Sequence, residues 1–157
     1  MADIEVREIE AVTVAALHRE GSARKIGAAF GELYGALMQA QAPLAQGPAI
    51  GVYYGEAEAF DPEDASFDVC APLQGDFEPP SGIEVRDLPA ARMAVAVHKG
   101  PYDHMGPLYE EMFQWIGARG LTVAGPVRER YLNGPKPGSD LTPSDYLTEV
   151  QVPVTEA

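Results

Sequence analysis

A carboxylate and a phenol stand two residues apart in the segment 125–132, which reads GPVRERYL. Its alternation of apolar and polar residues is typical of a strand, in which side chains two apart share a face. Val127, Glu129 and Tyr131 would then share a half-buried face, and the two intervening arginines would point to water. A glutamate rarely occupies such a face unless it is paired or functional. Glu129 is therefore our candidate site residue; the alternative is an edge-strand glutamate with its tip in solvent or paired with a nearby arginine.

A buried carboxylate among aromatic side chains could do two kinds of chemistry. It could meet the positive charge of an amphipathic ligand whose body stacks on the rings. It could equally be the general base of a hydrolase, because burial raises the pKa of a carboxyl group towards neutrality. The catalytic residues would then be Glu129, activating a water, and a tyrosine such as Tyr131 or Tyr53, polarising the substrate. The sequence does not separate binding from hydrolysis, because both need the same residues.

The elements that would position these residues occur twice along the chain. Residues 4–11 read IEVREIEA and residues 83–90 read IEVRDLPA, at an offset of 79 (83 − 4). Further on, Tyr53 answers Tyr131 at an offset of 78 (131 − 53). Two copies of such length are too few for a solenoid. We interpret the pattern as duplication of one supersecondary unit, with pseudo-twofold symmetry between the halves.

The length and the repeat together predict the fold. We expect a single domain of residues 1–157, with internal repeats at about 3–73 and 82–155, each a ββαββ unit. Two such units predict an α+β protein in which an antiparallel sheet carries both helices on one face. A central ligand cleft is expected at the seam between the halves, since pockets favour junctions between packed units.

The two helices have recognisable ends. The first should begin at Ser22, a good N-cap, and stop before Pro43, and the second should end at Gly120. A glycine costs about 1 kcal/mol relative to alanine inside a helix, and the first helix carries three of them on one face. We interpret this stripe as close backbone packing, with room for a ligand as the alternative; its members are Gly27, Gly31 and Gly35.

The duplication offers an internal control on Glu129. At an offset of 78 it aligns with Gly51, so one half places a carboxylate where the other has no side chain. This favours a cavity with an acid on one wall and open space opposite, and a β-bulge at Gly51 is the alternative. Tyr53 and Tyr131 would face inward, as site residues or as core aromatics. The second helix would extend the same wall, or only the core, through Tyr109, Met112 and Trp115.

Composition narrows the class of partner. The net charge of −13 argues against direct nucleic-acid binding and against an anionic membrane surface. No apolar run is long enough to span a bilayer and no signal peptide is visible, so we expect a soluble cytoplasmic protein, a monomer or homodimer. His18 and His98 each end a predicted strand, which suggests a shared structural role. Neither they nor the single cysteine, Cys70, show metal-ligand spacing, and no metal or cofactor is expected.

Several short motifs, in this order and at this spacing, resemble those of a known family. The run HKGPY at 98–102, the helix ending in Trp115-Ile116, the motif Gly-Pro-x-x-Glu-x-Tyr at 125–131 and the closing Pro153-Val154 resemble the GyrI-like family. That family includes the effector-binding domains of AraC- and MerR-type regulators. The resemblance implies a tandem duplication of a strand–helix–strand–strand unit and a central cavity for amphipathic, often cationic, small molecules. It places an acidic residue at the cavity floor, which here is Glu129.

The resemblance also implies two other functions. Some stand-alone members hydrolyse cyclopropane-containing genotoxic natural products, using the same glutamate and nearby aromatic residues. Others are described as gyrase inhibitors, which implies a protein–protein interaction module. In multi-domain members a helix-turn-helix domain precedes this module, and we expect this chain to contain none. A stand-alone binding domain for hydrophobic or cationic small molecules is thus the leading expectation, with the hydrolase and then the gyrase-inhibitor function as alternatives.

Overall fold

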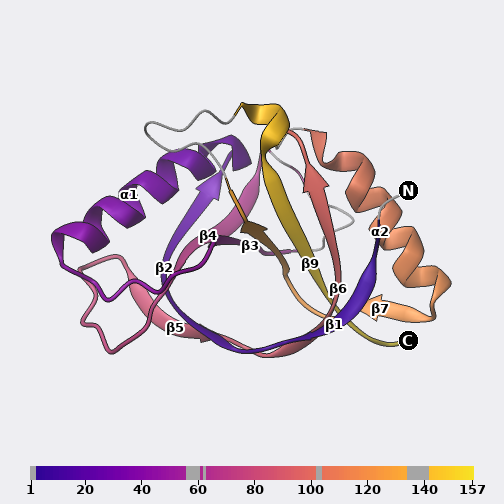
Figure 1. The fold of residues 1–157 in the computed structure, drawn as a ribbon, viewed down its shortest axis with the longest axis horizontal. Helices are drawn as coiled ribbons and strands as arrows, with labels where there is room; N and C mark the ends of the chain where they lie inside the picture. Colours follow the sequence, from indigo (N-terminus) through magenta and orange to yellow (C-terminus); the bar gives the residue numbers. More distant parts are fainter. Residues whose placement is uncertain (1–2, 56–60, 62, 102–103, 134–141) are drawn as a thin grey trace.

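The fold is a curled antiparallel sheet that carries two helices (Figure 1). The computed structural model describes residues 3–55, 61, 63–101, 104–133 and 142–157. The strand order is β1-β6-β9-β8-β3-β4-β2-β5, and the short β7 pairs with β9 outside this path. The bounds are β1 Glu5–Ile9, β2 Val12–Gly21, α1 Ile26–Gln39, β3 Ala49–Tyr53, β4 Ala65–Pro72, β5 Glu84–Leu88, β6 Ala91–Lys99, α2 Gly106–Ala118, β7 Leu121–Val123, β8 Val127–Tyr131 and β9 Leu147–Glu156.

Local signals in the sequence fix where α1 begins and where both helices end. Ser22 Oγ accepts a hydrogen bond from Arg24 N (3.2 Å) and caps a short 3-10 turn that leads into α1. At the other end Gln41 takes a φ of 56°, and the amide of Ala42 donates to Leu37 O at 2.9 Å, which closes α1 before the proline that follows. Gly120, just past α2, has a φ of 72° as the C-terminal glycine was expected to.

The first strand of each half pairs with the other half. β1 pairs with β6 and β5 pairs with β2, and the register is unbroken between the two ladders, since Ile9 faces Ala91 and Val12 faces Leu88. The segments 5–16 and 84–95 therefore form one long antiparallel ribbon, which runs along the lower edge of the molecule in Figure 1. This exchange fastens the two halves to each other. It also covers the side of the sheet that faces away from the helices.

That cover corrects one expectation about β8. We expected both of its arginines to point to water, but Arg128 is buried, with 6% of its surface exposed. Its guanidinium donates to Pro89 O (2.8 Å), which lies where β5 leads into β6. Arg130 is half-buried and forms an ion pair with Glu149 (2.5 Å). Alternation correctly separated the two faces of the strand, but here both faces are covered.

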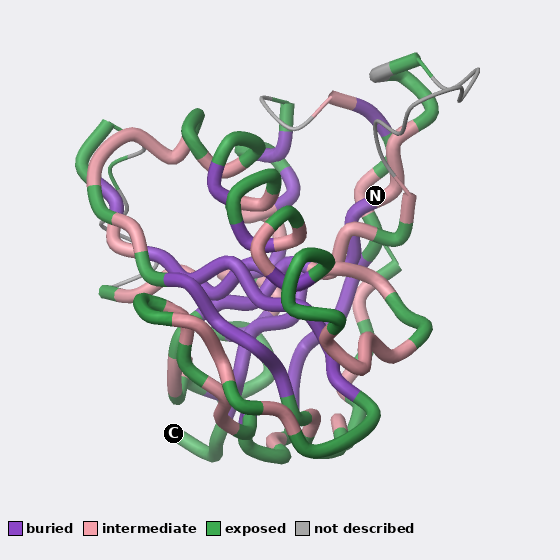
Figure 2. The backbone as a smooth tube through the Cα atoms, turned by 90° about the vertical axis from the view of Figure 1, so that its left-hand side faces the viewer, coloured by how far each residue is buried: buried purple, intermediate pink, exposed green. Residues whose placement is uncertain are grey.

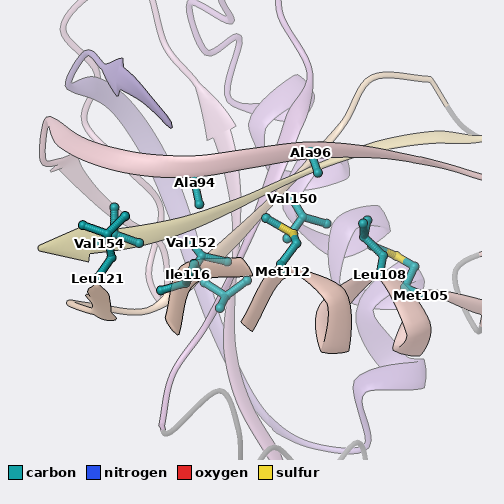
Figure 3. Packing of buried hydrophobic residues seen from close by; sticks show 11 residues of the cluster. Ala94, Ala96, Met105, Leu108, Met112, Ile116, Leu121, Val150, Val152 and Val154 are labelled. Carbon is teal, nitrogen blue, oxygen red and sulfur yellow. The ribbon is translucent and has the colours of Figure 1, made fainter. Parts of the chain in front are cut away.

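The helices lie on one face of the sheet, over opposite halves. α1 places Leu33 and Leu37 against Phe67 and Val69 of β4. α2 packs against β6 and β9 through a row of buried side chains seen in Figure 3, which shows Leu108, Met112, Ile116, Ala94, Ala96, Val150 and Val152. Figure 2 shows that the buried segments are concentrated in the strands at the centre of the molecule, whereas the loops are mostly exposed. Truncating a fully buried leucine such as Leu33 to alanine would cost about 2–5 kcal/mol.

One expectation about a small feature is wrong, and another takes a different form in each half. The glycine stripe of α1 is not packed: Gly27, Gly31 and Gly35 are exposed, and a Cβ added at any of them would meet nothing within 4 Å. The two histidines each form a structural bond, as expected: His98 Nε2 donates to Pro101 O (3.1 Å) in the turn after β6, and His18 Nδ1 lies 2.8 Å from Asp68 Oδ1. The two bonds differ because the side chains lie on different faces of the sheet. Leu17 and Ala96 both pack beneath the helices, so the next residue, His18, turns to the opposite face, whereas His98, two residues after Ala96, returns to the helix face.

The element order β-β-α-β-β recurs in both halves, and α2 alone is followed by the extra strand β7. Duplication of one unit remains an interpretation of the sequence. Tyr102 of the HKGPY run lies outside the described residues. Among the described segments, neither helix is both long and apolar enough to cross a bilayer.

Candidate functional site

β3 and β8 are the two central strands of the sheet. The candidate site lies where they pair, on the face that the helices cover. Gly51 pairs directly with Glu129, and Val69 and Val150 flank this pair on the next strands. Residues paired across neighbouring strands share a face, and Val69 and Val150 lie beneath α1 and α2 respectively. Glu129 therefore stands on the helix face between the two helices, with 8% of its surface exposed.

Three tyrosines from three different elements surround this carboxylate. The Tyr131 hydroxyl donates to Glu129 Oε1 (2.7 Å), and the Tyr109 hydroxyl of α2 donates to Oε2. Tyr53 of β3 completes the group, with its hydroxyl 3.1 Å from that of Tyr131. The sequence predicted all four residues as candidates, and the structure brings them together. Glu129 forms no ion pair with any residue that the structure describes.

Burial governs the acid–base properties of the group. It raises the pKa of the Glu129 carboxyl above its usual value, while the hydrogen bonds from the tyrosines and the charge of His98 act in the opposite direction. Burial first, and then the nearby Glu129 charge, hold the pKa values of Tyr109 and Tyr131 well above 10. The phenols therefore stay protonated at physiological pH, and they are the donors available to a charged Glu129.

Further aromatic side chains extend the group along both helices. Phe30 of α1 meets the edge of the Tyr131 ring at 5.6 Å between centroids and 82° between planes, and Tyr34 follows one turn later. On the other side Phe113 lies next to Tyr109 on α2. All are half-buried. Sequence reasoning took Phe30 as core and did not single out Phe113; their spacing of four residues from Tyr34 and Tyr109 is the signal that could have found them.

Gly51 does not face open space, contrary to expectation. A Cβ placed there would lie 2.8 Å from the Tyr131 hydroxyl and 3.2 Å from Ile26 Cδ1. Tyr131 pairs with Ala49, so its ring reaches diagonally across the strand boundary and lies over the glycine. The missing side chain therefore makes room for a protein ring. Gly51 belongs to the group as the residue that lets Tyr131 reach Glu129.

Two other predicted site residues lie elsewhere. Met112 is fully buried among the core residues between α2 and the sheet. Trp115 is six residues beyond Tyr109, and at about 100° per residue the two side chains point roughly 120° apart around the helix. Trp115 consequently lines a pocket with β1 and β7 on the far flank of α2. Helical spacing placed both residues on the inner half of α2 but could not tell one flank from the other.

A second buried carboxylate, Asp68 of β4, lies on the opposite face of the sheet. It accepts hydrogen bonds from Tyr54 OH (2.7 Å) and from Arg86, and His18 Nδ1 lies 2.8 Å from its Oδ1. The bond to Asp68 is the main cause that raises the pKa of His18. His18 Nε2 also approaches Glu20 (3.1 Å) and, more distantly, Ser66 Oγ (3.4 Å). A histidine held between two carboxylates is poorly suited to accept a proton from a serine, so we read this group as a structural ion pair.

Comparison with known proteins identifies the family. The model of the GyrI-like small molecule binding domain matches residues 2–155. The chain belongs to the GyrI-like family. A DNA gyrase inhibitor from Erwinia billingiae (strain Eb661) is 31% identical to this GyrI-like domain over 117 residues, which span 71% of the chain and 72% of that protein.

Solved structures share the fold. The GyrI-like domain superposes on the C-terminal domain of EcmrR with a TM-score of 0.91 at 19% identity, covering 100% of this chain and 99% of that domain. It spans 58% of the EcmrR chain solved in a complex with DNA. SAV2435 bound to tetraphenylphosphonium has a TM-score of 0.64 at 17% identity, with 98% of this chain and 94% of that chain covered.

Proposed function

We propose that this GyrI-like domain binds amphipathic cationic small molecules between its two helices, with Glu129 as the counter-charge. The observation that carries the proposal is the partner set of Glu129: a buried carboxylate whose described hydrogen-bond donors are all phenols. A buried carboxylate without a cation is unfavourable, and a ligand that brings a positive charge would remove that penalty. Glu129, Tyr131, Tyr53, Tyr109 and Gly51 form the proposed site.

The surrounding rings suit the apolar part of such a ligand. Phe30 and Phe113 stand on opposite helices, and both are half-buried, so they keep apolar surface available to an incoming molecule. A cation near an aromatic face gains about 0.5–2 kcal/mol, and more when water is excluded. The shared fold with a protein solved in complex with tetraphenylphosphonium supports this class of ligand. A flat or propeller-shaped aromatic cation is therefore the natural first probe.

The decisive experiment is a titration of the protein with tetraphenylphosphonium by calorimetry. We expect Glu129→Gln, which keeps the side-chain shape but loses the charge, to weaken binding by about 10–100-fold, because an ion pair shielded from water contributes roughly 1.4–3 kcal/mol. Glu110→Gln is the matched control, because Glu110 is exposed on α2 beside Tyr109 and its replacement changes the net charge equally. Equal affinities for wild type and Glu129→Gln, or absence of binding by wild type at high micromolar ligand, would contradict the proposal.

Hydrolysis is the second candidate, and one contact favours it. The Tyr131 hydroxyl lies 2.7 Å from Glu129 Oε1, so a base and a donor could reach the same substrate atom, and burial raises the pKa of the base. Mass spectrometry after incubation with a strained cyclopropane substrate tests it. Water-derived product that forms with wild type but not with Glu129→Gln supports catalysis. Unchanged substrate after prolonged incubation with stoichiometric protein leaves binding alone.

A further inference from the structure

A pocket of about 410 Å³ lies on the flank of α2 opposite Tyr109, and it shares no lining residue with the Glu129 group. Its volume lies in the range of small-molecule sites. The apolar part of its wall consists of Ile4 and Val6 from the start of the chain, Trp115 of α2 and Leu121 of β7. In Figure 1 these elements meet at the right-hand end of the molecule, where both termini also lie.

The charged residues of this pocket are unevenly paired. The carboxylate of Glu156 has Arg92 at 3.3 Å, and that of Glu5 is paired with Arg7. The guanidinium of Arg119 instead lies over the Trp115 ring, 4.4 Å from the centroid. Within the described part of the chain no carboxylate lies within ion-pair distance of it. Arg119 is exposed, so its charge is accessible to an anion that enters the pocket beside the Trp115 ring.

We propose that this pocket is a second ligand site, which takes a small carboxylate with a flat apolar body. The ligand carboxylate would accept two parallel hydrogen bonds from the Arg119 guanidinium, whose fork matches it. The ligand body would rest on Trp115 and the aliphatic wall of Ile4 and Leu121. Arg92 is already balanced by Glu156, and Glu5 by Arg7, so Arg119 carries the positive charge of the pocket that is left for an anionic ligand.

Trp115 makes the site directly observable, because it is the only tryptophan in the chain. The probe is 4-tert-butylbenzoate, and the readout is tryptophan emission excited where tyrosine does not absorb, with equilibrium dialysis of the same samples. We expect a saturable change in emission with the benzoate, and binding at least about 10-fold weaker for the neutral 4-tert-butylbenzamide. Arg119→Gln should weaken benzoate binding by about 10-fold, equivalent to roughly 1.4 kcal/mol, and dialysis detects this even where the substitution alters the emission itself.

Two controls separate this site from the Glu129 site and from general charge effects. Arg24→Gln removes an equal charge from an arginine whose side chain is 87% exposed in the other half of the protein, and it should leave benzoate affinity unchanged. Glu129→Gln should also leave benzoate affinity unchanged. Weaker benzoate binding by Glu129→Gln would show that the benzoate occupies the Glu129 site. The absence of benzoate binding in dialysis up to millimolar concentration, or equal affinity for the amide, would overturn the proposal without affecting the proposed function.

Discussion

Three buried acids lie on the two faces of one sheet, and the two faces differ in how the acid charge is balanced. Asp68 carries its own cations, since Arg86 and His18 both bind its carboxylate. Glu149, also buried and on that same face, has Arg130 at 2.5 Å and Arg7 at 3.5 Å. Glu129, between the helices, accepts hydrogen bonds from the hydroxyls of Tyr109 and Tyr131 and from no arginine of the described residues. Asp68 and Glu149 are thus neutralised within the protein, whereas Glu129 forms no ion pair with the described residues.

This difference has an energetic meaning. Removing one member of a buried ion pair leaves the other charge uncompensated, which destabilises the fold. Removing the charge of an acid that has no cation partner relieves a penalty instead. Stability measurements can therefore separate an acid that holds the fold together from one that is retained for another purpose, and the predictions below use this contrast in order of decreasing effect.

The largest expected effect is on the paired acid. Asp68→Asn should lower the free energy of unfolding by about 2–3 kcal/mol, at the lower end for a broken buried pair because Arg86 is about one-third exposed. Glu129→Gln should leave it unchanged or raise it by up to about 1 kcal/mol, since the amide oxygen can still accept from one tyrosine hydroxyl and the amide nitrogen can donate to the oxygen of the other. Urea denaturation of both variants gives the two values. A larger loss for Glu129→Gln than for Asp68→Asn would reverse the assignment of roles.

The next effect concerns the glycine that faces Glu129. Gly51→Ala should weaken tetraphenylphosphonium binding several-fold and lower stability by about 1–2 kcal/mol, because its methyl group would meet the Tyr131 hydroxyl at 2.8 Å and displace the ring. Gly31→Ala is the matched control, because nothing lies within 4 Å of that position; it should stabilise α1 by up to about 1 kcal/mol. Calorimetric titration and thermal melting measure both. Unchanged ligand affinity of Gly51→Ala would return the glycine to a purely structural role.

The next effect is the pH dependence of stability, which should report the raised pKa of the Glu129 carboxyl group. Because burial raises its pKa in the folded protein, the native state binds this proton more tightly than the unfolded state does. The free energy of unfolding should therefore fall as pH rises from about 4.5 through the raised pKa. Denaturation curves across this range should show the decline in wild type and a flatter profile in Glu129→Gln. Over the same range the affinity for tetraphenylphosphonium should rise with pH, since the cation binds the deprotonated form.

The smallest effect belongs to His18, whose side chain is about half exposed. Its pKa is raised in the folded state, chiefly by Asp68, so its contribution to stability is complete below the unfolded value of about 6.5 and is lost as pH rises through the folded value. His18→Gln should remove this small decline near neutral pH and leave the one caused by Glu129. The His18 imidazole titration followed by NMR should report a lower pKa in Asp68→Asn. An equal His18 pKa in wild type and in Asp68→Asn would show that Asp68 does not raise the pKa of this histidine.

Much of the site follows from local sequence. Alternation along β8 placed Glu129 and Tyr131 on the same face. The repeat aligned Gly51 with Glu129, which pair directly in the sheet, and Tyr53 with Tyr131, whose hydroxyls are hydrogen-bonded. Tyr109 was also named, but as part of one wall with Trp115, whereas the two side chains point about 120° apart and only Tyr109 reaches Glu129. Period and offset are properties of neighbouring residues and of repeated segments, so they can be read without knowing the fold.

Other features depended on contacts between distant segments. The exchange of β1 and β5 buries Arg128, the Tyr131 ring fills the space over Gly51, and the angle around α2 separates Trp115 from Tyr109. The sequence by itself determined both helices, every strand except β7, the two faces of β8 and the identity of the central acid, because these follow from periodicity, repetition and capping. Only the tertiary structure decided which acids acquired an arginine, because a charge is neutralised by whichever strands the fold brings alongside it.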